Sequence, residues 1–301
     1  MSPRHFLDIA GLTADEVRTI LDLSQRPIPS LGKPLDGLGA ALIFEKPSNR
    51  TRHSMEIAVM QLGGHPVYTR GEEVGIDVRE TAEDIAAVMA GYHGVLAARV
   101  FKHDVVVRMA KVSAVPVVNM LSDHSHPLQA LADALTMQQT IGDLAGRSVA
   151  WFGDWNNVAR SLAEICVLLG AKFSVATPTG YAPAPSEVAR INALGSGEFV
   201  AGTDPVAAVT GADAVHTDVW VSMGQEAETA EKEKAFAAYK VTASLMAHAA
   251  PKAQFFHCLP AHRGYEVDAD VIDGSASRVI PQAHNRLHSA RGALAFIMGV
   301  K

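Results

Sequence analysis

Short apolar runs alternate along the chain with stretches in which apolar residues recur at helical spacing. Apolar runs of strand length lie at residues 40–44, 95–98, 115–118, 148–154, 173–176, 213–220 and 255–259. Helical spacing of apolar residues is found at residues 55–62, 128–135, 158–169 and 290–300. Near the N-terminus, Thr13 and Glu16 form a capping box, which predicts one more helix start. Strands that alternate with helices predict parallel sheets flanked by helices.

The alternation of strands and helices runs through twice. A glycine-containing break at residues 141–146 follows the helix predicted at residues 128–135, and the pattern restarts with a strand at Ser148. We therefore predict an α/β fold of two similar-sized domains, each a parallel β-sheet flanked by helices. The hinge between them is expected near residues 140–147.

The composition is that of an ordinary globular protein and excludes several classes. The chain has 301 residues, of which 48% are hydrophobic and 19% charged, and its net charge of −6 argues against a nucleic-acid partner. No apolar run is long enough to span a membrane, and the N-terminus does not resemble a signal peptide. Cys166 and Cys258 are the only cysteines, so no disulfide framework is expected. These features predict a cytoplasmic location.

Polar clusters follow the predicted strands at their carboxyl ends. They lie at residues 48–52, Arg99, residues 122–129, 154–157, 218–225 and 258–263. Ligands of open α/β sheets bind beyond the carboxyl ends of the strands. We therefore expect the clusters to form one site shared by the two domains.

The first cluster is Ser48-Asn49-Arg50-Thr51-Arg52, at the start of a predicted helix. Free backbone N–H groups and the helix dipole favour an anion there, and arginine adds charged donors suited to phosphate. The segment predicts a cradle for a phosphate or a carboxylate. The alternative is a helix N-cap with solvated arginines.

The third cluster, His126-Pro127-Leu128-Gln129, opens a helix with proline at its first position. His126 and Gln129 share a helix face, so together they can hold a carbonyl and an amide. The alternative is a helix cap with an exposed histidine. A metal site with His124 is disfavoured, because the neighbouring sequence offers only Asp123 as a third ligand.

The second half of the chain offers a different set of groups. Asp218 ends a strand and precedes Ser222-Met223-Gly224, a set that could bind an amino and a carboxylate group. The alternative is a solvated loop. His257 and Cys258 are neighbours in a predicted strand, so they should point to opposite faces and not act as a pair. Gly153 begins no G-x-G-x-x-G pattern, which disfavours a nicotinamide-linked oxidoreductase.

Taken together, these motifs resemble the transcarbamoylase family over nearly the whole chain. The resemblance is carried by residues 48–52, Arg99, His-Pro-Leu-Gln at 126–129, Asp-x-x-x-Ser-Met-Gly at 218–224, His-Cys-Leu-Pro at 257–260 and Asn-Arg-Leu-His at 285–288. Ser-Met-Gly and His-Cys-Leu-Pro favour the members that act on ornithine. The reaction that this implies converts carbamoyl phosphate and L-ornithine into L-citrulline and phosphate, with no metal and no organic cofactor.

The resemblance also implies roles for individual residues. Phosphate would be held by Ser48, Asn49, Arg50 and Thr51, and the carbamoyl group by Arg99, His126, Pro127, Leu128, Gln129, Cys258, Leu259 and Arg286. Of these, the catalytic residues would be Arg99, His126, Cys258 and Arg286. Ornithine would be held by Asn157, Asp218, Ser222 and Met223.

The domain assignment follows from the same resemblance. Residues 1–141 would bind carbamoyl phosphate, joined by a C-terminal helix at residues 288–301 that returns to the first domain, and residues 147–287 would bind ornithine. A homotrimer with sites near the subunit interfaces is expected, without nucleic acid or membrane.

The chain departs from the family pattern at two places. Asn49 stands where the family usually has threonine, and asparagine keeps a donor and favours helix caps. The region that usually supplies a glutamine to a neighbouring subunit contains none at residues 72–77, which leaves that contact open. The competing hypotheses are a transcarbamoylase for another amine, such as putrescine or N-acetylornithine, and a catalytically silent relative.

Overall fold

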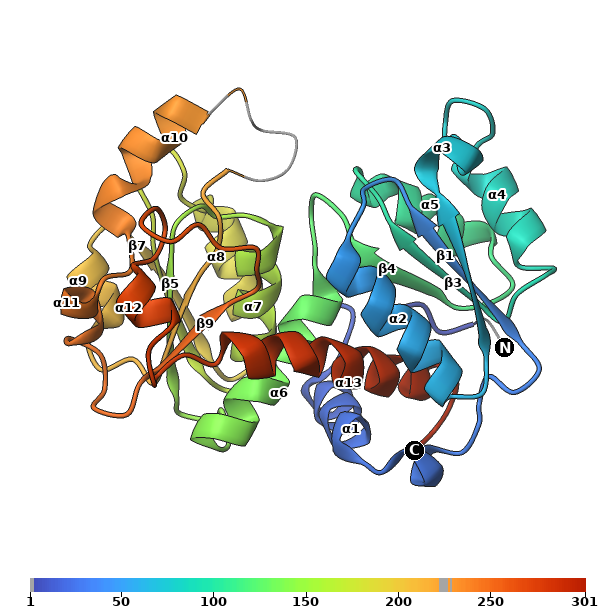
Figure 1. The fold of residues 1–301 in the computed structure, drawn as a ribbon, viewed down its shortest axis with the longest axis horizontal. Helices are drawn as coiled ribbons and strands as arrows, with labels where there is room; N and C mark the ends of the chain where they lie inside the picture. Colours follow the sequence, from blue (N-terminus) through green and yellow to red (C-terminus); the bar gives the residue numbers. More distant parts are fainter. Residues whose placement is uncertain (1–2, 222–226, 228) are drawn as a thin grey trace. The chain divides into compact units, whose positions relative to one another are not determined.

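The computed structural model describes residues 3–221, 227 and 229–301. The chain divides into two compact units, here called unit 1 (Met1–Ala132 with His284–Lys301) and unit 2 (Asp133–Ala283). Each unit holds one parallel sheet with helices around it, which confirms the predicted fold class (Figure 1). The unit boundaries fall inside helices α6 (Pro127–Ile141) and α13 (Val279–Ile297).

Unit 1 contains a four-stranded sheet in the order β2-β1-β3-β4. Its strands are β1 (Gly39–Phe44), β2 (His65–Arg70), β3 (Val95–Arg99) and β4 (Val117–Leu121). Its helices before α6 are α1 (Ala14–Gln25), α2 (Asn49–Gln61), α3 (Gly71–Val74), α4 (Ala82–Met89) and α5 (His103–Val112). The central strands are buried almost throughout, as expected where helices cover both faces of a parallel sheet.

Unit 2 contains a five-stranded parallel sheet in the order β7-β6-β5-β8-β9. Its strands are β5 (Ser148–Phe152), β6 (Lys172–Ala176), β7 (Glu198–Gly202), β8 (Ala214–Thr217) and β9 (Gln254–His257). Its helices are α7 (Asn157–Leu168), α8 (Pro185–Asn192), α9 (Pro205–Val209), α10 (Thr229–Phe236), α11 (Ala243–Met246) and α12 (Ala269–Ile272). Two strands have no counterpart among the predicted ones. These are β2 and β7, which lie at sheet edges, are partly exposed and have no more than three consecutive apolar residues.

The last part of α13 packs in unit 1 beside α1 and α2, as predicted for the C-terminal helix (Figure 1). Arg291 donates to Gln61 Oε1 at 2.8 Å and to the Ser24 carbonyl at 3.1 Å. A Cβ at Gly292 would lie 2.1 Å from Ser24 Oγ, so only glycine permits this approach of two helices. The helix begins at Val279, well before the apolar pattern that starts near residue 290. Buried polar residues interrupt the apolar pattern in the first half of the helix, so that pattern does not predict the early start.

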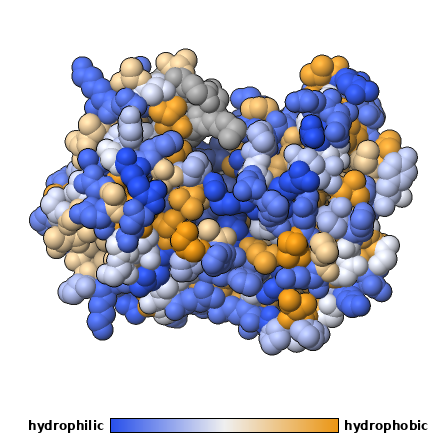
Figure 2. All heavy atoms as spheres, viewed as in Figure 1, coloured by the Kyte–Doolittle hydropathy of each residue, from blue (hydrophilic) through white to orange (hydrophobic). Residues whose placement is uncertain are grey.

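On the face drawn in Figure 2, apolar residues lie in small groups among hydrophilic ones. None of the helices in the described part of the chain has both the length and the apolar character needed to cross a membrane.

Candidate active site

The strand order in the sheet of unit 1 reverses between β1 and β3. These two strands are paired neighbours, although β2 lies between them in sequence. Phe44, the last residue of β1, pairs with Arg99, the last residue of β3. The chain leaves β1 through residues 45–48 and enters α2, so the Ser48–Arg52 cluster and Arg99 meet at this edge. Such a switch point is where open parallel sheets bind ligands.

The N-terminus of α2 is capped by Ser48, whose Oγ accepts from the Thr51 N–H at 3.4 Å and donates to Thr51 Oγ1 at 3.1 Å. The cap predicted as the alternative is therefore present. The first turn contains no acidic residue, whereas α1 and α4 each begin with two. It contains Arg50 instead, a cation at the positive end of a helix dipole, which is unfavourable unless an anion binds there.

Arg52 is turned to other partners, although it belongs to the same sequence motif. Its Nε donates to Glu56 at 2.9 Å, and its guanidinium lies 3.8 Å from the ring centre of Tyr68. Its side chain is 45% exposed. Arg50, which is half-buried, is therefore the better candidate for an anion contact.

Arg286 joins two of the predicted clusters within unit 1. Its Nη1 donates to Gln129 Oε1 at 2.6 Å and its Nη2 to Thr51 Oγ1 at 3.0 Å, and only 5% of the residue is exposed. The sequence pattern placed Arg286 just before the last helix, but it lies inside α13. A helix from the far end of the chain thus ties the start of α2 to the start of α6.

His126 is buried immediately before α6, in the field of Arg286 and Arg99. Burial holds the pKa of its imidazole well below the usual value, and the two guanidinium groups lower it further. The ring is therefore neutral at pH 7 and can offer one donor and one acceptor. The rest of the motif is buried as well, since Pro127, Leu128 and Gln129 are enclosed at the helix start.

The turn before His126 is held by Asn119, a residue that the sequence analysis did not single out. Asn119 Nδ2 donates to the Leu7 carbonyl at 2.8 Å and to Ser122 Oγ at 3.1 Å, while the Ser122 N–H donates to the Ser125 carbonyl at 2.9 Å. Asn119 is completely buried in β4. Its signal in the sequence is a polar residue within an apolar strand.

Unit 2 has its own switch point, between β5 and β8. Asn156 follows β5 and caps α7, with its Oδ1 accepting from the N–H groups of Val158 and Ala159. Its Nδ2 donates to Asp218 Oδ2 at 3.1 Å, just past the end of β8. Asn157, the predicted ornithine contact, is the half-buried first residue of α7. Ser222 and Met223 lie outside the described residues.

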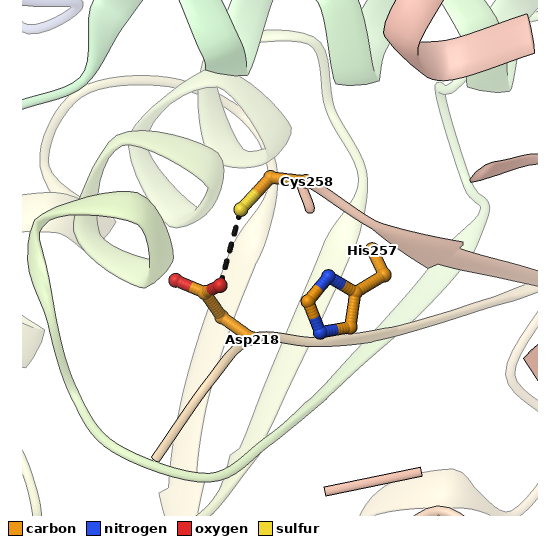
Figure 3. Close-up of side chains that lie close together, drawn as sticks. All are labelled: Asp218, His257 and Cys258. Atoms are coloured by element: carbon orange, nitrogen blue, oxygen red, sulfur yellow. Dashed lines mark hydrogen bonds between the residues drawn. The ribbon is translucent and has the colours of Figure 1, made fainter. Parts of the chain in front are cut away.

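Asp218 is 8% exposed, and its carboxylate accepts from groups on three segments. Besides Asn156, the Val219 N–H donates to its Oδ1 at 2.8 Å, and Cys258 Sγ lies 3.1 Å from the same oxygen (Figure 3). These contacts hold a negative charge in a fixed orientation. They also bring together three sequence clusters, those after β5, β8 and β9.

His257 and Cys258 do not point fully apart, contrary to the prediction from strand alternation. Strand β9 ends at His257, so alternation does not extend to Cys258. A ring nitrogen of His257, Cys258 Sγ and an Asp218 oxygen all lie within 4.8 Å of one another (Figure 3). The prediction that the pair does not act together still fits the bonding, because His257 Nδ1 accepts from the Leu259 N–H at 2.9 Å and the thiol faces Asp218.

A thiolate, an imidazole and a carboxylate are also groups that zinc binds. In the described part of the chain, Asp218, His257 and Cys258 are the one cluster of three such groups. The Nδ1 lone pair of His257 is engaged by Leu259, so a metal there would have to displace a backbone hydrogen bond. The arrangement favours hydrogen bonding over metal binding, and the set around His124 does not form such a cluster within these residues.

Residues 4–139 match the carbamoyl-P binding domain of aspartate/ornithine carbamoyltransferase, and residues 145–297 match its Asp/Orn binding domain. The chain belongs to the aspartate/ornithine carbamoyltransferase family. It is 46% identical to the ornithine carbamoyltransferase of Thermus thermophilus, over 97% of this chain and 96% of that one.

Two further relatives come from Pyrococcus furiosus. Its curated anabolic ornithine carbamoyltransferase is 45% identical over 99% of this chain and 98% of that one. The solved structure of an ornithine carbamoyltransferase from that organism superposes with a TM-score of 0.93 at 43% identity, covering 100% of this chain and 99% of the other.

Proposed function

We propose that the protein transfers the carbamoyl group of carbamoyl phosphate to the side-chain amine of L-ornithine, giving L-citrulline and phosphate. The observation that carries the proposal is the Arg286 side chain, which joins Thr51 at the anion-favouring start of α2 to Gln129. This arrangement supports a phosphate site beside a carbamoyl site in unit 1. Family membership supports the same activity.

In unit 1, the phosphate of the substrate binds Ser48, Asn49, Arg50 and Thr51. Its carbamoyl group binds Arg99, His126 and Gln129, and Pro127, Leu128 and Arg286 complete that side of the site. Cys258 and Leu259 are assigned to the same substrate by the family pattern. Ser48 Oγ donates its proton to Thr51 Oγ1, so Ser48 must give up this bond before its hydroxyl can donate to phosphate.

In unit 2, Asp218 and Asn157 bind ornithine, together with Ser222 and Met223 by the family pattern. The carboxylate suits the α-amino group, which remains a cation at pH 7. The fixed orientation of Asp218 means that this contact is preset before ornithine arrives.

The reaction joins the neutral amine nitrogen of ornithine to the carbamoyl carbon and breaks the bond from that carbon to the phosphate oxygen. The amine loses a proton, which the departing phosphate can carry. Negative charge grows on the carbonyl oxygen and on the leaving phosphate. Arg99, Arg286 and Arg50 stabilise that charge, while neutral His126 contributes a hydrogen bond without an added charge.

The test is an assay of carbamoyl phosphate with ornithine, putrescine, N-acetylornithine and aspartate in parallel. Citrulline formed from ornithine with a kcat/KM well above that for every other amine supports the proposal. Preference for putrescine or N-acetylornithine would favour the second candidate, a transcarbamoylase for another amine. Product formation with none of the four would contradict both.

We also propose that residues 1–141 with residues 288–301 form the carbamoyl phosphate domain and that residues 147–287 form the ornithine domain.

We further propose that the protein is a cytoplasmic homotrimer with its sites near the subunit interfaces. Unit 1 exposes large apolar side chains on α2, β2 and α4 and in the segments next to them, which supports self-association. They are Ile57, Met60, Val67, Val78, Val88 and Tyr92. Light scattering should give the mass of three 31.9 kDa chains. The mass of one chain would contradict the trimer.

A further inference from the structure

Leu259, two residues after the end of β9, has an unusual backbone conformation. Leu259 has a φ of +59°, in the left-handed region that a branched side chain adopts only at a cost in free energy. Cys258, whose thiol contacts Asp218, directly precedes it. The position of the thiol therefore depends on whatever stabilises the backbone at Leu259.

The side chain that stabilises this backbone is His257. Its Nδ1 accepts from the Leu259 N–H at 2.9 Å, and its own backbone N–H donates to Gln282 Oε1 at 2.9 Å. Gln282 in turn donates to the buried Asp133 at 2.6 Å. The end of β9 is thus held in unit 2 from the main chain and from the imidazole ring.

The orientation of the ring is set by Glu266, which lies outside all of the sequence motifs and is not among the residues assigned to either substrate. His257 Nε2 lies 3.1 Å from Glu266 Oε1, and the same oxygen accepts from the His262 N–H at 2.6 Å. His257 and Glu266 are each only 1% exposed. Glu266 needs a proton on Nε2, and the Leu259 N–H needs a lone pair on Nδ1. One neutral tautomer of His257, with its proton on Nε2, satisfies both partners.

Glu266 is ionised under physiological conditions. Burial raises its pKa, but the hydrogen bonds from His257 and from the His262 N–H outweigh burial and leave the pKa below its usual value. As a carboxylate, Glu266 can only accept, so it favours the tautomer of His257 with its proton on Nε2. In the other neutral tautomer, the Nδ1–H would face the Leu259 N–H, and neither group could accept.

We propose that Glu266 is a positioning residue for the transfer reaction. It keeps the proton of His257 on Nε2, so that Nδ1 remains the acceptor of the Leu259 N–H and the Cys258-Leu259 segment stays in place against Asp218. Its effect on catalysis rests on the proposed function, whereas its effect on the tautomer of His257 does not. Without Glu266, the buried Nε2–H has lost its acceptor, and the ring reorients or changes tautomer.

The first experiment compares three substitutions in the full-length protein. Glu266→Met removes the acceptor and should lower kcat/KM for ornithine about 10- to 100-fold, because small displacements of reacting groups slow catalysis by such factors. Glu266→Gln keeps an oxygen at the Oε1 position and should stay within about threefold of the parent. Glu164→Met is the matched control, because Glu164 is also 1% exposed in unit 2 and pairs with Arg190. It should lower the melting temperature and leave kcat/KM of the folded protein nearly unchanged.

The affinity for inorganic phosphate, measured by calorimetry, separates positioning from general damage. Glu266→Met should leave it unchanged, because the phosphate contacts lie in unit 1. Equal activity of Glu266→Met and Glu164→Met would overturn the proposal. So would a Glu266→Gln variant as slow as Glu266→Met, since that would show that the acceptor is not what matters.

A second substitution tests the route through His257. Asparagine at position 257 places a carbonyl oxygen near the position of Nδ1, so His257→Asn can accept from Leu259 whatever residue 266 is. Glu266→Met should therefore slow His257→Asn much less than it slows the parent, a non-additive pair of the kind that coupled residues show. Equal slowing in both backgrounds would overturn the proposed route.

Ring-nitrogen NMR of protein labelled with ¹⁵N-histidine gives a readout that does not depend on activity. The signal lost in His257→Asn assigns the ring, and the parent should show a protonated Nε2 and an accepting Nδ1. Glu266→Met should shift this signal and Glu164→Met should not. If that holds while the parent makes no citrulline, the proposed function fails and the role of Glu266 in holding the tautomer stands. A parent ring protonated on Nδ1 overturns the inference.

Discussion

The sites of unit 1 and unit 2 use the same position in the fold for opposite charges. Both lie where the strand order of a parallel sheet reverses, between β1 and β3 in one unit and between β5 and β8 in the other. The first gathers guanidinium groups, a neutral imidazole and the start of a helix. The second gathers a carboxylate, a thiol and an amide. The fold therefore decides where a ligand binds, and the side chains at the strand ends decide its charge.

The two sites also differ in how their side chains are held. In unit 1 the brace comes from far along the chain, since Arg286 and Thr51 are 235 residues apart. In unit 2 the contacts join the ends of the neighbouring strands β5, β8 and β9, and Asp218 is 62 residues from Asn156 and 40 from Cys258. Each site should accordingly fail separately when its own side chains are changed.

The largest effect is expected for Arg50→Ala in unit 1. Loss of a preset cation at the phosphate should lower kcat/KM about 100- to 1,000-fold, as for removal of one oxyanion donor. It should also weaken the binding of inorganic phosphate in calorimetry. Steady-state kinetics with both substrates varied gives the first quantity.

The matched control for Arg50→Ala is Arg52→Ala, two residues along the same helix. Arg52 is engaged with Glu56 and Tyr68, so its loss should change kcat/KM by no more than about threefold. Near-parental activity of Arg50→Ala, or an equal loss in both variants, would refute the assignment of Arg50 to the phosphate.

A somewhat smaller effect is expected for Asp218→Asn in unit 2. Removal of a charge that binds a cationic group costs about 1.5–3 kcal/mol, so kcat/KM for ornithine should fall about 10- to 100-fold. Phosphate affinity should not change, because its contacts lie in the other unit. Kinetics with ornithine varied, together with calorimetry, measure both.

Asp213→Asn provides the comparison for Asp218, because Asp213 lies just before β8 and Asp218 just after it. Asp213 accepts from Arg147 at 3.2 Å and from the Ser148 N–H at 3.0 Å, at the opposite end of the sheet from the site. Asp213→Asn should affect stability and not the KM for ornithine. A raised KM in this variant, or an unchanged one in Asp218→Asn, would contradict the predicted role of Asp218.

The sequence predicts those features whose physical cause is local. The capping box of Thr13, the apolar runs of the central strands and the start of α6 at Pro127 are all present in the structure. These features depend on neighbouring residues, on burial between covering helices and on proline geometry. The edge strands β2 and β7 were missed because exposure to solvent removes the apolar pattern.

The features that could not be predicted depend on contacts between distant residues. The early start of α13 is hidden because Gln282 and Arg286 are polar, and they are buried only because Asp133, Gln129 and Thr51 receive their hydrogen bonds. The pairing of Glu266 with His257 likewise has no local signature. Spacing identified the chemical groups of the site, whereas the way in which they are held required the structure.

A modest effect is expected for Cys258→Ser. A serine hydroxyl can still donate to Asp218, so kcat/KM should fall about tenfold or less, as for a weakened single hydrogen bond. The other cysteine, Cys166, is fully buried, and burial raises the pKa of its thiol, so it should not react with alkylating agents in the folded protein.

Thiol titration compares the two cysteines directly. With a chromogenic disulfide reagent, one thiol per chain should react in the folded parent and two should react in the denatured chain. No thiol should react in folded Cys258→Ser. Reaction of Cys258→Ser in the folded state would contradict the assignment of the accessible thiol to Cys258.

The smallest effect concerns an ion pair of unit 2 that lies outside its site. Hydrogen bonds from Arg190 and Arg160 lower the pKa of Glu187 from 4.5 to about 2, even though burial opposes this shift. A carboxyl whose pKa is lower in the folded state stabilises that state above its unfolded pKa, and this stabilisation is lost as pH falls. Glu187→Gln should therefore unfold more easily than the parent at pH 7, by roughly 1–2 kcal/mol after allowance for solvent screening.

Denaturant unfolding at pH 7, 5 and 3 tests this, because the difference between parent and Glu187→Gln should narrow as the pH falls from 4.5 towards 2. Asp273→Asn is the control, since the Arg263–Asp273 pair is exposed on both sides and its loss should not measurably change unfolding at any of these values. A difference for Glu187→Gln that stays constant with pH would mean that packing, and not the charge of Glu187, accounts for it. Both variants should retain the kcat/KM of the parent, because neither Glu187 nor Asp273 is assigned to either site.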